Sequence, residues 1–273
     1  MKVIDTHIHL FEKPYSDLFD NSHIKDGTEG ELHLYKEYRE KYSLEAAFVI
    51  CYDEGHCPGN TAYVKSLARN EKWIHSFGYV KPGINFATDA QRMVSENHFG
   101  ISCYLKPDDP GEWLTNSDLG FLRDKNIPLS LTIRPSQCRM LGKVLKRFPG
   151  LTVLINHMGR PELTEKGLDF EKYKTALTLA EFENVYIKLS GFYAFSRQGW
   201  RYPQTDLFEV IDLLKRNFGA ERLLFASDFS PVLEFNTYKQ TLELLRSDYG
   251  GFSGNELAQI YYLNAEKIIS NQG

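Results

Sequence analysis

The chain lacks several features that would point to other classes of protein. No uninterrupted apolar run approaches about 18 residues, so we expect no membrane-spanning helix. Basic residues are not in excess, because 32 Lys and Arg face 36 Asp and Glu for a net charge of −4, and no long block carries one sign. Nucleic acid is therefore not an expected partner, since phosphate binding needs a clustered basic face.

Cysteines are few and the amino terminus has no signal-like region. Cys51, Cys57, Cys103 and Cys138 lack the density and paired spacing of a disulfide framework, and the chain begins directly with strand-like residues. We therefore expect a cytoplasmic protein whose partner is a small-molecule substrate. Whether it forms a homo-oligomer stays open.

The composition is that of a globular protein with a sizeable core. Apolar residues make up 42% and charged residues 25% of the 273 residues. This length suits one large domain or two small ones. No Pro- or Ser-rich linker separates two halves, so we predict a single domain over residues 1–273.

Apolar strand-like segments alternate with helical ones along the whole chain. Helical patterns at 31–38, 60–70, 89–97, 118–125, 136–148, 168–182 and 205–218, and helices from 237 and 253, follow these strands in turn. The strands are expected at 2–10, 46–52, 74–80, 100–106, 127–133, 151–157, 184–190 and 223–228. This order predicts an α/β fold, a closed (β/α)8 TIM barrel with a C-terminal helix. An open doubly wound sheet is the alternative, but no glycine-rich phosphate turn follows the first strand.

In such a barrel the active site lies at the carboxyl ends of the strands. His7 and His9 end the first strand, and side chains two residues apart share one face, so both imidazoles can bind one zinc-like ion. Asp228 ends the eighth strand, which neighbours the first in a closed barrel. We therefore expect His7, His9 and Asp228 to form a metal site, or Asp228 to take a proton from an attacking water.

Other strand ends carry further candidates. His157 after the sixth strand is expected to act as general acid, oxyanion donor or extra ligand, although a core histidine is the simpler alternative. Arg134 and Arg160 could both bind one carboxylate of the substrate, or could be ordinary surface charges. Lys106 could contact an anion, bridge metals if carboxylated, or extend to solvent. The ligand-type residues at 52–57 are expected to be solvated rather than metal-bound.

Five stretches together resemble one family. DTHIH at 5–9, NHMGRP at 156–161, NVYIKLSG at 184–191, FGAERLLFASD at 218–228 and NAEK at 264–267 are similar, in order, to the motifs of the amidohydrolase-2 branch of the amidohydrolase superfamily. This branch includes sugar lactonases, pyrone dicarboxylate lactonase and zinc-dependent decarboxylases. The resemblance implies a (β/α)8 barrel, with His7, His9 and Asp228 as metal ligands and His157 as the catalytic histidine of the sixth strand.

The chain departs from the decarboxylases of this branch at the fifth strand. They carry a histidine there, where this chain has Ile133-Arg134-Pro135. Members of the lactonase group also lack that histidine, and some work without metal, with the eighth-strand aspartate activating water and arginines holding a substrate carboxylate. Arg134 and Arg160 match that pattern. Phe229-Ser230 replaces the usual Trp-Pro after the last-strand aspartate.

We therefore predict a hydrolase that opens a lactone or cyclic ester of a small, anionic substrate with water activated at Asp228. One divalent metal is expected to assist, zinc before manganese, and a metal-free mechanism stays open. A metal-dependent decarboxylase of an aromatic or unsaturated acid is the first alternative, and a non-catalytic small-molecule-binding barrel is the second. The long segments 11–30 and 192–204 are expected to act as lids.

Overall fold

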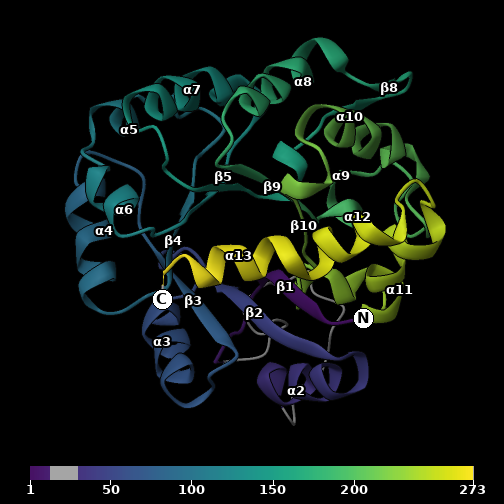
Figure 1. The fold of residues 1–273 in the computed structure, drawn as a ribbon, viewed down its shortest axis with the longest axis horizontal. Coiled ribbons are helices and arrows are strands. Elements are labelled where there is room, and N and C mark those ends of the chain that lie inside the picture. The colour runs from purple at the N-terminus through teal and green to yellow at the C-terminus, as the bar shows by residue number, and fades with distance from the viewer. Residues whose placement is uncertain (13–29, 273) are drawn as a thin grey trace.

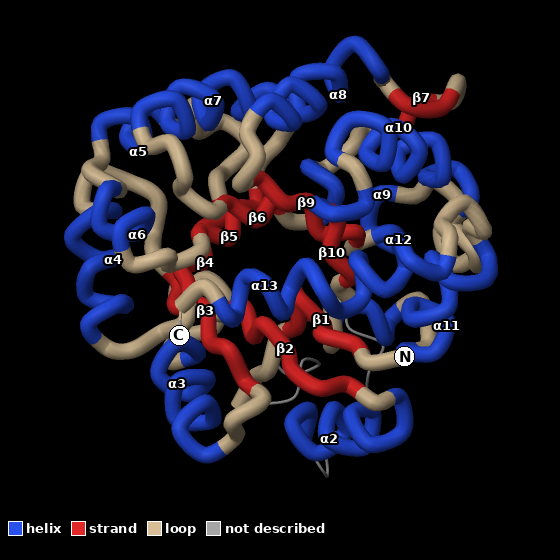
Figure 2. Tube along the Cα trace, in the orientation of Figure 1, coloured by secondary structure: helices blue, strands red, loops and turns tan. Residues whose placement is uncertain are grey.

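The computed structural model describes residues 1–12 and 30–272. In this part of the chain, eight parallel strands form one sheet in the order β1-β2-β3-β4-β5-β6-β9-β10, seen as the central ring of strands in Figure 2. Each of the eight expected strands is present, which confirms the barrel. Their bounds are β1 (Val3–Ile8), β2 (Leu44–Ile50), β3 (Ile74–Tyr79), β4 (Gly100–Tyr104), β5 (Leu129–Thr132), β6 (Val153–Ile155), β9 (Val185–Leu189) and β10 (Leu223–Phe225).

The first and last strands meet and nearly close the barrel. Ile8 bridges to Phe229, the amide of His9 donates to the carbonyl of Phe229 at 2.5 Å, and the amide of Asp228 donates to the carbonyl of His7 at 2.9 Å. This backbone pairing fixes the register of the two strand ends. It therefore places the His7 and His9 side chains beside that of Asp228.

Helices surround the strands (Figures 1 and 2). The structure differs from the sequence prediction in the short elements, since α5, α9 and the small hairpin of β7 (Leu163–Thr164) and β8 (Gly167–Leu168) were not expected. Elements of two to five residues carry too little periodicity to be recognised in a sequence. The helix bounds are α2 (Gly30–Tyr42), α3 (Asn60–Asn70), α4 (Phe86–Ser95), α5 (Glu112–Asn116), α6 (Gly120–Asp124), α7 (Cys138–Arg147), α8 (Phe170–Leu177), α9 (Phe192–Phe195), α10 (Phe208–Phe218), α11 (Tyr238–Glu243), α12 (Gly254–Ala258) and α13 (Asn264–Ser270).

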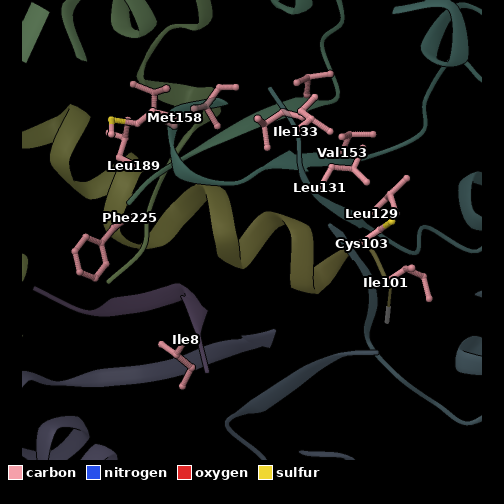
Figure 3. Close-up of a cluster of buried hydrophobic side chains, with 14 of the residues drawn as sticks. Ile8, Ile101, Cys103, Leu129, Leu131, Ile133, Val153, Met158, Leu189 and Phe225 are labelled. Atoms are coloured by element: carbon pink, nitrogen blue, oxygen red, sulfur yellow. The ribbon is translucent and has the colours of Figure 1, made fainter. Parts of the chain in front are cut away.

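The main core lies between the strands and the helices. Strand residues such as Leu131, Val153 and Leu189 are buried there (Figure 3), and each large apolar side chain removed from water contributes roughly 1.5–3 kcal/mol. Strand residues buried on both faces explain the continuous apolar runs in the sequence.

The amino end of the barrel is closed by a second apolar cluster. Ile4, Phe48 and Leu154 pack there with Ala265 and Ile268 of α13. Figure 1 shows α13 crossing the ring of strands between α12 and the carboxyl terminus. Because this end is filled, the carboxyl end of the barrel is the one left to form a site.

Polar side chains occupy the interior toward that carboxyl end. Ser130, Thr132, Asn156 and Lys188 are all at most 4% exposed. Buried polar groups cost free energy unless they are hydrogen-bonded, so their placement here needs partners. Separately, none of the helices in the described residues is long and apolar enough to cross a membrane.

Candidate active site

His7, His9 and Asp228 converge at the carboxyl end of the barrel. The Nε2 atoms of the two histidines are 3.2 Å apart, and each lies 3.6 Å from Oδ1 of Asp228. All three residues are buried. Among the described residues, these three form the group whose ligand atoms are close enough to hold one metal ion.

Hydrogen bonds orient both imidazoles. Nδ1 of His9 lies 2.8 Å from the carbonyl oxygen of Ile50, and Nδ1 of His7 lies 3.2 Å from Oδ1 of Asn156. Both oxygens can only accept, so each Nδ1 carries the proton and donates it. Each Nε2 therefore presents a lone pair, and two lone pairs that face each other at 3.2 Å fit a shared cation.

A buried polar network holds the amide of Asn156. Ser130 Oγ donates to its Oδ1 at 2.9 Å, and its Nδ2 donates to Thr132 Oγ1 at 3.0 Å. Lys188 Nζ donates to Ser130 Oγ at 2.9 Å and lies 3.5 Å from His7 Nδ1. The network thus runs from β9 through β5 and β6 to a histidine of β1.

Burial and the neighbouring charges keep the imidazole of His7 neutral. Burial, and then the positive charge of Lys188, lower the pKa of His7 well below its ordinary value. Burial also lowers the pKa of Lys188, against the pull of the Asp5 and Asp228 carboxylates. A neutral imidazole is the form that binds a metal ion.

Asp228 is held as a carboxylate. Burial opposes its ionisation, but the neighbouring imidazoles of His157 and His9 and the hydrogen bond from Tyr193 outweigh burial and lower the pKa of Asp228 to about 2. The hydroxyl of Tyr193 donates to Oδ2 at 2.7 Å. Tyr193 belongs to α9, in the segment expected to act as a lid, and the sequence did not predict its contact with Asp228. Its only signal was its place just after β9, in an aromatic-rich stretch.

His157 faces the same carboxylate from β6. Its Nδ1 lies 2.9 Å from Ser190 Oγ and 3.9 Å from Asp228 Oδ2, and its ring centroid is 4.7 Å from that of His7. Burial lowers the pKa of His157 to about 4, so the ring is neutral near pH 7. His157 has φ 53°, and Met158 and Arg160 are also left-handed, a strained turn of the kind found where function requires it.

Arg134 and Arg160 lie near one another without an acid shared between them. Arg134 Nη1 is 4.0 Å from Glu162, and the guanidinium of Arg160 lies 5.6 Å from the ring centroid of Phe195. Burial and the charge of Arg134 lower the pKa of Arg160, and its buried Nε has no hydrogen-bond partner within the described residues. An anion would satisfy this pair of guanidinium groups.

Lys106 lies apart from the histidine cluster. It is exposed and lines a cavity of about 860 Å³ together with Tyr79, Tyr104 and the loop residues Asp53 to His56. Asp53 and Glu54 in that loop accept hydrogen bonds from the amides of Gly55 and Gly59. The loop is not part of the metal-binding group found among the described residues.

The two expected lids differ in what is known of them. Most of segment 11–30 lies outside the described residues. Segment 192–204 contains α9, which brings Tyr193 to Asp228, and the exposed Trp200, whose ring contacts Phe235. It therefore contributes directly to the site, while its lid role stays a prediction.

Comparison with known proteins gives one family and a consistent fold. The model of the family described as amidohydrolase matches residues 4–269. An amidohydrolase from Burkholderia multivorans, with bound zinc, is 19% identical with a TM-score of 0.79, covering 99% of both chains. A probable 2-pyrone-4,6-dicarboxylic acid hydrolase from Acinetobacter baumannii, with citric acid bound, is 18% identical with a TM-score of 0.71, covering 99% of this chain and 100% of the other. A 2,6-dihydroxybenzoate decarboxylase from Rhizobium is 12% identical with a TM-score of 0.63, covering 100% of both.

Proposed function

The chain belongs to the amidohydrolase family, and on that premise we propose that it hydrolyses a lactone or cyclic ester of a small, anionic substrate. The observation that carries the proposal is the position of the Asp228 carboxyl group, which faces His7 and His9 at 3.6 Å and His157 at 3.9 Å. A base in the centre of three imidazoles suits the activation of water beside a polarised carbonyl group.

Asp228 can carry the proton that moves during ring opening. The oxygen of water bonds to the carbonyl carbon while its proton passes to Asp228. The ring C–O bond then breaks, and the ring oxygen takes the proton from Asp228 and leaves as a hydroxyl group, so the product is a hydroxy acid and the Asp228 carboxylate is restored. The low pKa of Asp228, about 2, keeps the carboxylate ionised across neutral pH.

His157 is suited to the electrophilic side of the reaction. It is neutral near pH 7. If Ser190 Oγ donates to its Nδ1, the ring proton sits on Nε2, where it can donate to the developing oxyanion. A neutral imidazole can do this without carrying a positive charge in a buried site.

The donor set fits one divalent cation. His7 Nε2, His9 Nε2 and Asp228 Oδ1 would hold it, zinc first because two imidazoles and a carboxylate are typical of catalytic zinc, with manganese as the alternative. When bound, such an ion polarises a carbonyl oxygen and lowers the pKa of water. The lone pairs that the protein aims at one point, with both Nδ1 protons committed elsewhere, support this assignment.

Arg134 and Arg160 support an anionic substrate. Arg134 is close enough to Arg160 to lower the pKa of Arg160, and two neighbouring guanidinium groups favour a carboxylate between them. The A. baumannii neighbour is named for a dicarboxylic acid whose pyrone ring is a cyclic ester, and it binds citric acid. These are properties of that protein, and they agree with the substrate class proposed here.

Lactone hydrolysis by the purified protein tests the proposal. We expect ring opening of a carboxylate-bearing lactone, with Zn²⁺ or Mn²⁺ raising the rate. Asp228→Asn should lower the rate of lactone hydrolysis by a factor of at least about 100, which is the usual contribution of a general base. Asp124→Asn, at the exposed end of α6, is the matched control and should keep full activity. A broad lactone panel that stays intact with and without metal would refute the proposal.

Decarboxylation is the second candidate. A row of aromatic rings leads outward from the carboxylate, with Tyr193 stacked on Phe235 at 5.1 Å, and this favours a flat aromatic acid. Arg134 stands where the decarboxylases resembled in sequence carry a histidine, which favours hydrolysis. Release of CO2 from a hydroxybenzoate, lost on adding a chelator, would select the decarboxylase. A ligand that binds and is recovered unchanged would select a non-catalytic barrel.

A further inference from the structure

The cavity of about 860 Å³ that Lys106 lines lies at the carboxyl ends of β2, β3 and β4, the same end of the barrel as the histidine cluster. Its lining includes Tyr79 and Tyr104, whose ring centroids are 6.0 Å apart. Tyr104 contacts Tyr52 at 5.6 Å, and Tyr52 contacts His9 at 5.5 Å. A chain of contacting rings thus runs from the lining of the cavity through Tyr52 to His9.

The acidic groups of this cavity are already engaged. Asp109 accepts from the amide of Gly111 and from the indole of Trp113 at 2.7 and 2.9 Å. Glu54 accepts from the amides of Gly59 and Thr61 at 2.6 and 2.9 Å. The remaining two are Asp53, bonded to the amide of Gly55, and Asp89, paired with Arg92 at 3.8 Å. These four carboxylates therefore hold loops in place and offer little to a ligand.

Two of the basic groups that line this cavity have no acidic partner in the described part of the chain. Within the described residues, Arg92 is paired with Asp89 and Glu96, and His56 with Asp53, whereas Lys81 and Lys106 have no ion pair or side-chain hydrogen bond. Lys81 lies two residues beyond the end of β3 and Lys106 two residues beyond the end of β4, and these two strands are parallel neighbours. Both lysines therefore line the same cavity as Tyr79 and Tyr104.

We propose that Lys81 and Lys106 form an outer subsite for a second carboxylate of the substrate. The inference rests on the proposed function and deepens it, because the substrate would carry one anionic group near Arg134 and Arg160 and another on an arm that reaches this cavity. The cavity has room for such an arm, since pockets of about 300–1,000 Å³ accommodate drug-sized ligands. Lys81 and Lys106 would bind the carboxylate at the end of that arm.

Protection of lysines from acetylation tests the subsite without any assay of activity. The wild-type protein is treated with an amine-acetylating reagent, with and without adipate as the dicarboxylate probe, and each lysine is quantified by peptide mass spectrometry. We expect adipate to protect Lys81 and Lys106. Lys72 is the internal control, because it is exposed and lies before β3, at the opposite end of the same strand from Lys81. Equal reactivity of Lys81 and Lys106 with and without adipate would overturn the proposal.

Calorimetry on variants gives the second arm of the test. Lys81→Met with Lys106→Met should weaken adipate binding about tenfold, because two partly exposed charge contacts each contribute a modest share. Lys72→Met should bind adipate as the wild type does. If the double variant binds adipate unchanged, or if Lys72→Met weakens binding equally, the subsite is refuted. Neither result depends on lactone hydrolysis, so failure of the subsite and failure of the proposed function are distinguished.

Discussion

The hydroxyl group of Tyr193 donates a hydrogen bond of 2.7 Å to Oδ2 of Asp228, the residue that also faces His7 and His9 through Oδ1. One oxygen of the carboxylate is therefore occupied by a phenol while the other points at the imidazoles. This contact ties α9, at the start of the segment expected to be a lid, to the proposed base.

The Tyr193→Phe variant should move the acid limb of the pH–rate profile. The hydrogen bond from Tyr193 helps to lower the pKa of Asp228 to about 2, so its loss raises that pKa. The carboxylate is active when ionised, so on acidification the variant should lose activity at a higher pH than the wild type. We expect this shift to be about one pH unit, which is typical of a hydrogen bond to a charged group. Measuring kcat/KM from pH 3 to 8 checks this.

Tyr262→Phe is the matched control for that variant. Its hydroxyl also donates to a carboxylate, Glu266 on α13, at 2.6 Å, but at the amino end of the barrel. Its pH–rate profile should match the wild type. An unshifted acid limb in Tyr193→Phe would show that this hydrogen bond does not tune the base.

The Lys188→Met variant should weaken metal binding while preserving stability. Lys188 supports Ser130 and the amide of Asn156, which holds Nδ1 of His7. Loss of an outer partner of a ligand commonly weakens metal affinity about 10- to 100-fold. Replacing a fully buried ammonium group by an apolar side chain of similar length should leave Tm unchanged or raised.

Competition with a chromophoric chelator measures this zinc affinity, and the absorption spectrum of the Co²⁺-loaded protein reports the geometry of the ligands. Lys125→Met, at an exposed position after α6, is the control. Wild-type zinc affinity in Lys188→Met would contradict a positioning role. A large fall in Tm with unchanged affinity would assign Lys188 to the fold alone.

Removal of the histidine donors should abolish metal binding. We expect protein purified in the presence of zinc to hold one ion per chain, and His7→Ala with His9→Ala to hold none, because a lone carboxylate binds zinc weakly. Elemental analysis after dialysis measures both. His33→Ala with His56→Ala removes two exposed histidines and should keep the ion. Equal zinc contents in the two double variants would place the metal elsewhere.

Acid should destabilise the fold through His98. Burial, and then the charge of Lys65, lower the pKa of His98 to about 4, and its buried Nε2 has no partner in the part of the chain that the structure describes. The unfolded chain takes up this proton near pH 6.5, so the stability contributed by neutral His98 is present above pH 6.5 and is lost as the pH falls toward 4. The shift corresponds to about 3 kcal/mol.

Urea unfolding of His98→Gln between pH 7.5 and 4.5 checks this dependence. Glutamine can keep a hydrogen bond to Ser76, which now lies 3.1 Å from His98 Nδ1, but it does not titrate. Its free energy of unfolding should fall less steeply with acid than that of the wild type. His33→Gln, at an exposed position, should follow the wild type, and an identical slope for His98→Gln would exclude His98 as the source.

Periodicity and strand-end chemistry were sufficient to predict the barrel and the identity of its central residues. Continuous apolar runs mark strands buried on both faces, and α3 begins and ends where its pattern does. Barrel closure alone then implied that His7 and His9 would meet Asp228, and the backbone pairing of β1 with Phe229 brings them together. The roles of these residues, and of His157, Arg134, Arg160 and Lys106, stay predictions.

The amino-acid sequence by itself determined the eight strands, their order of alternation with helices, and which polar side chains end them, because these depend on local patterns of burial. Only the tertiary structure decided that Tyr193 bonds Asp228, that Lys188 points into the barrel beside His7, and that Lys81 joins Lys106 over a shared cavity. These contacts join residues far apart in the chain, so the packing of whole strands and helices sets their distances. No local pattern in the amino-acid sequence determines that packing.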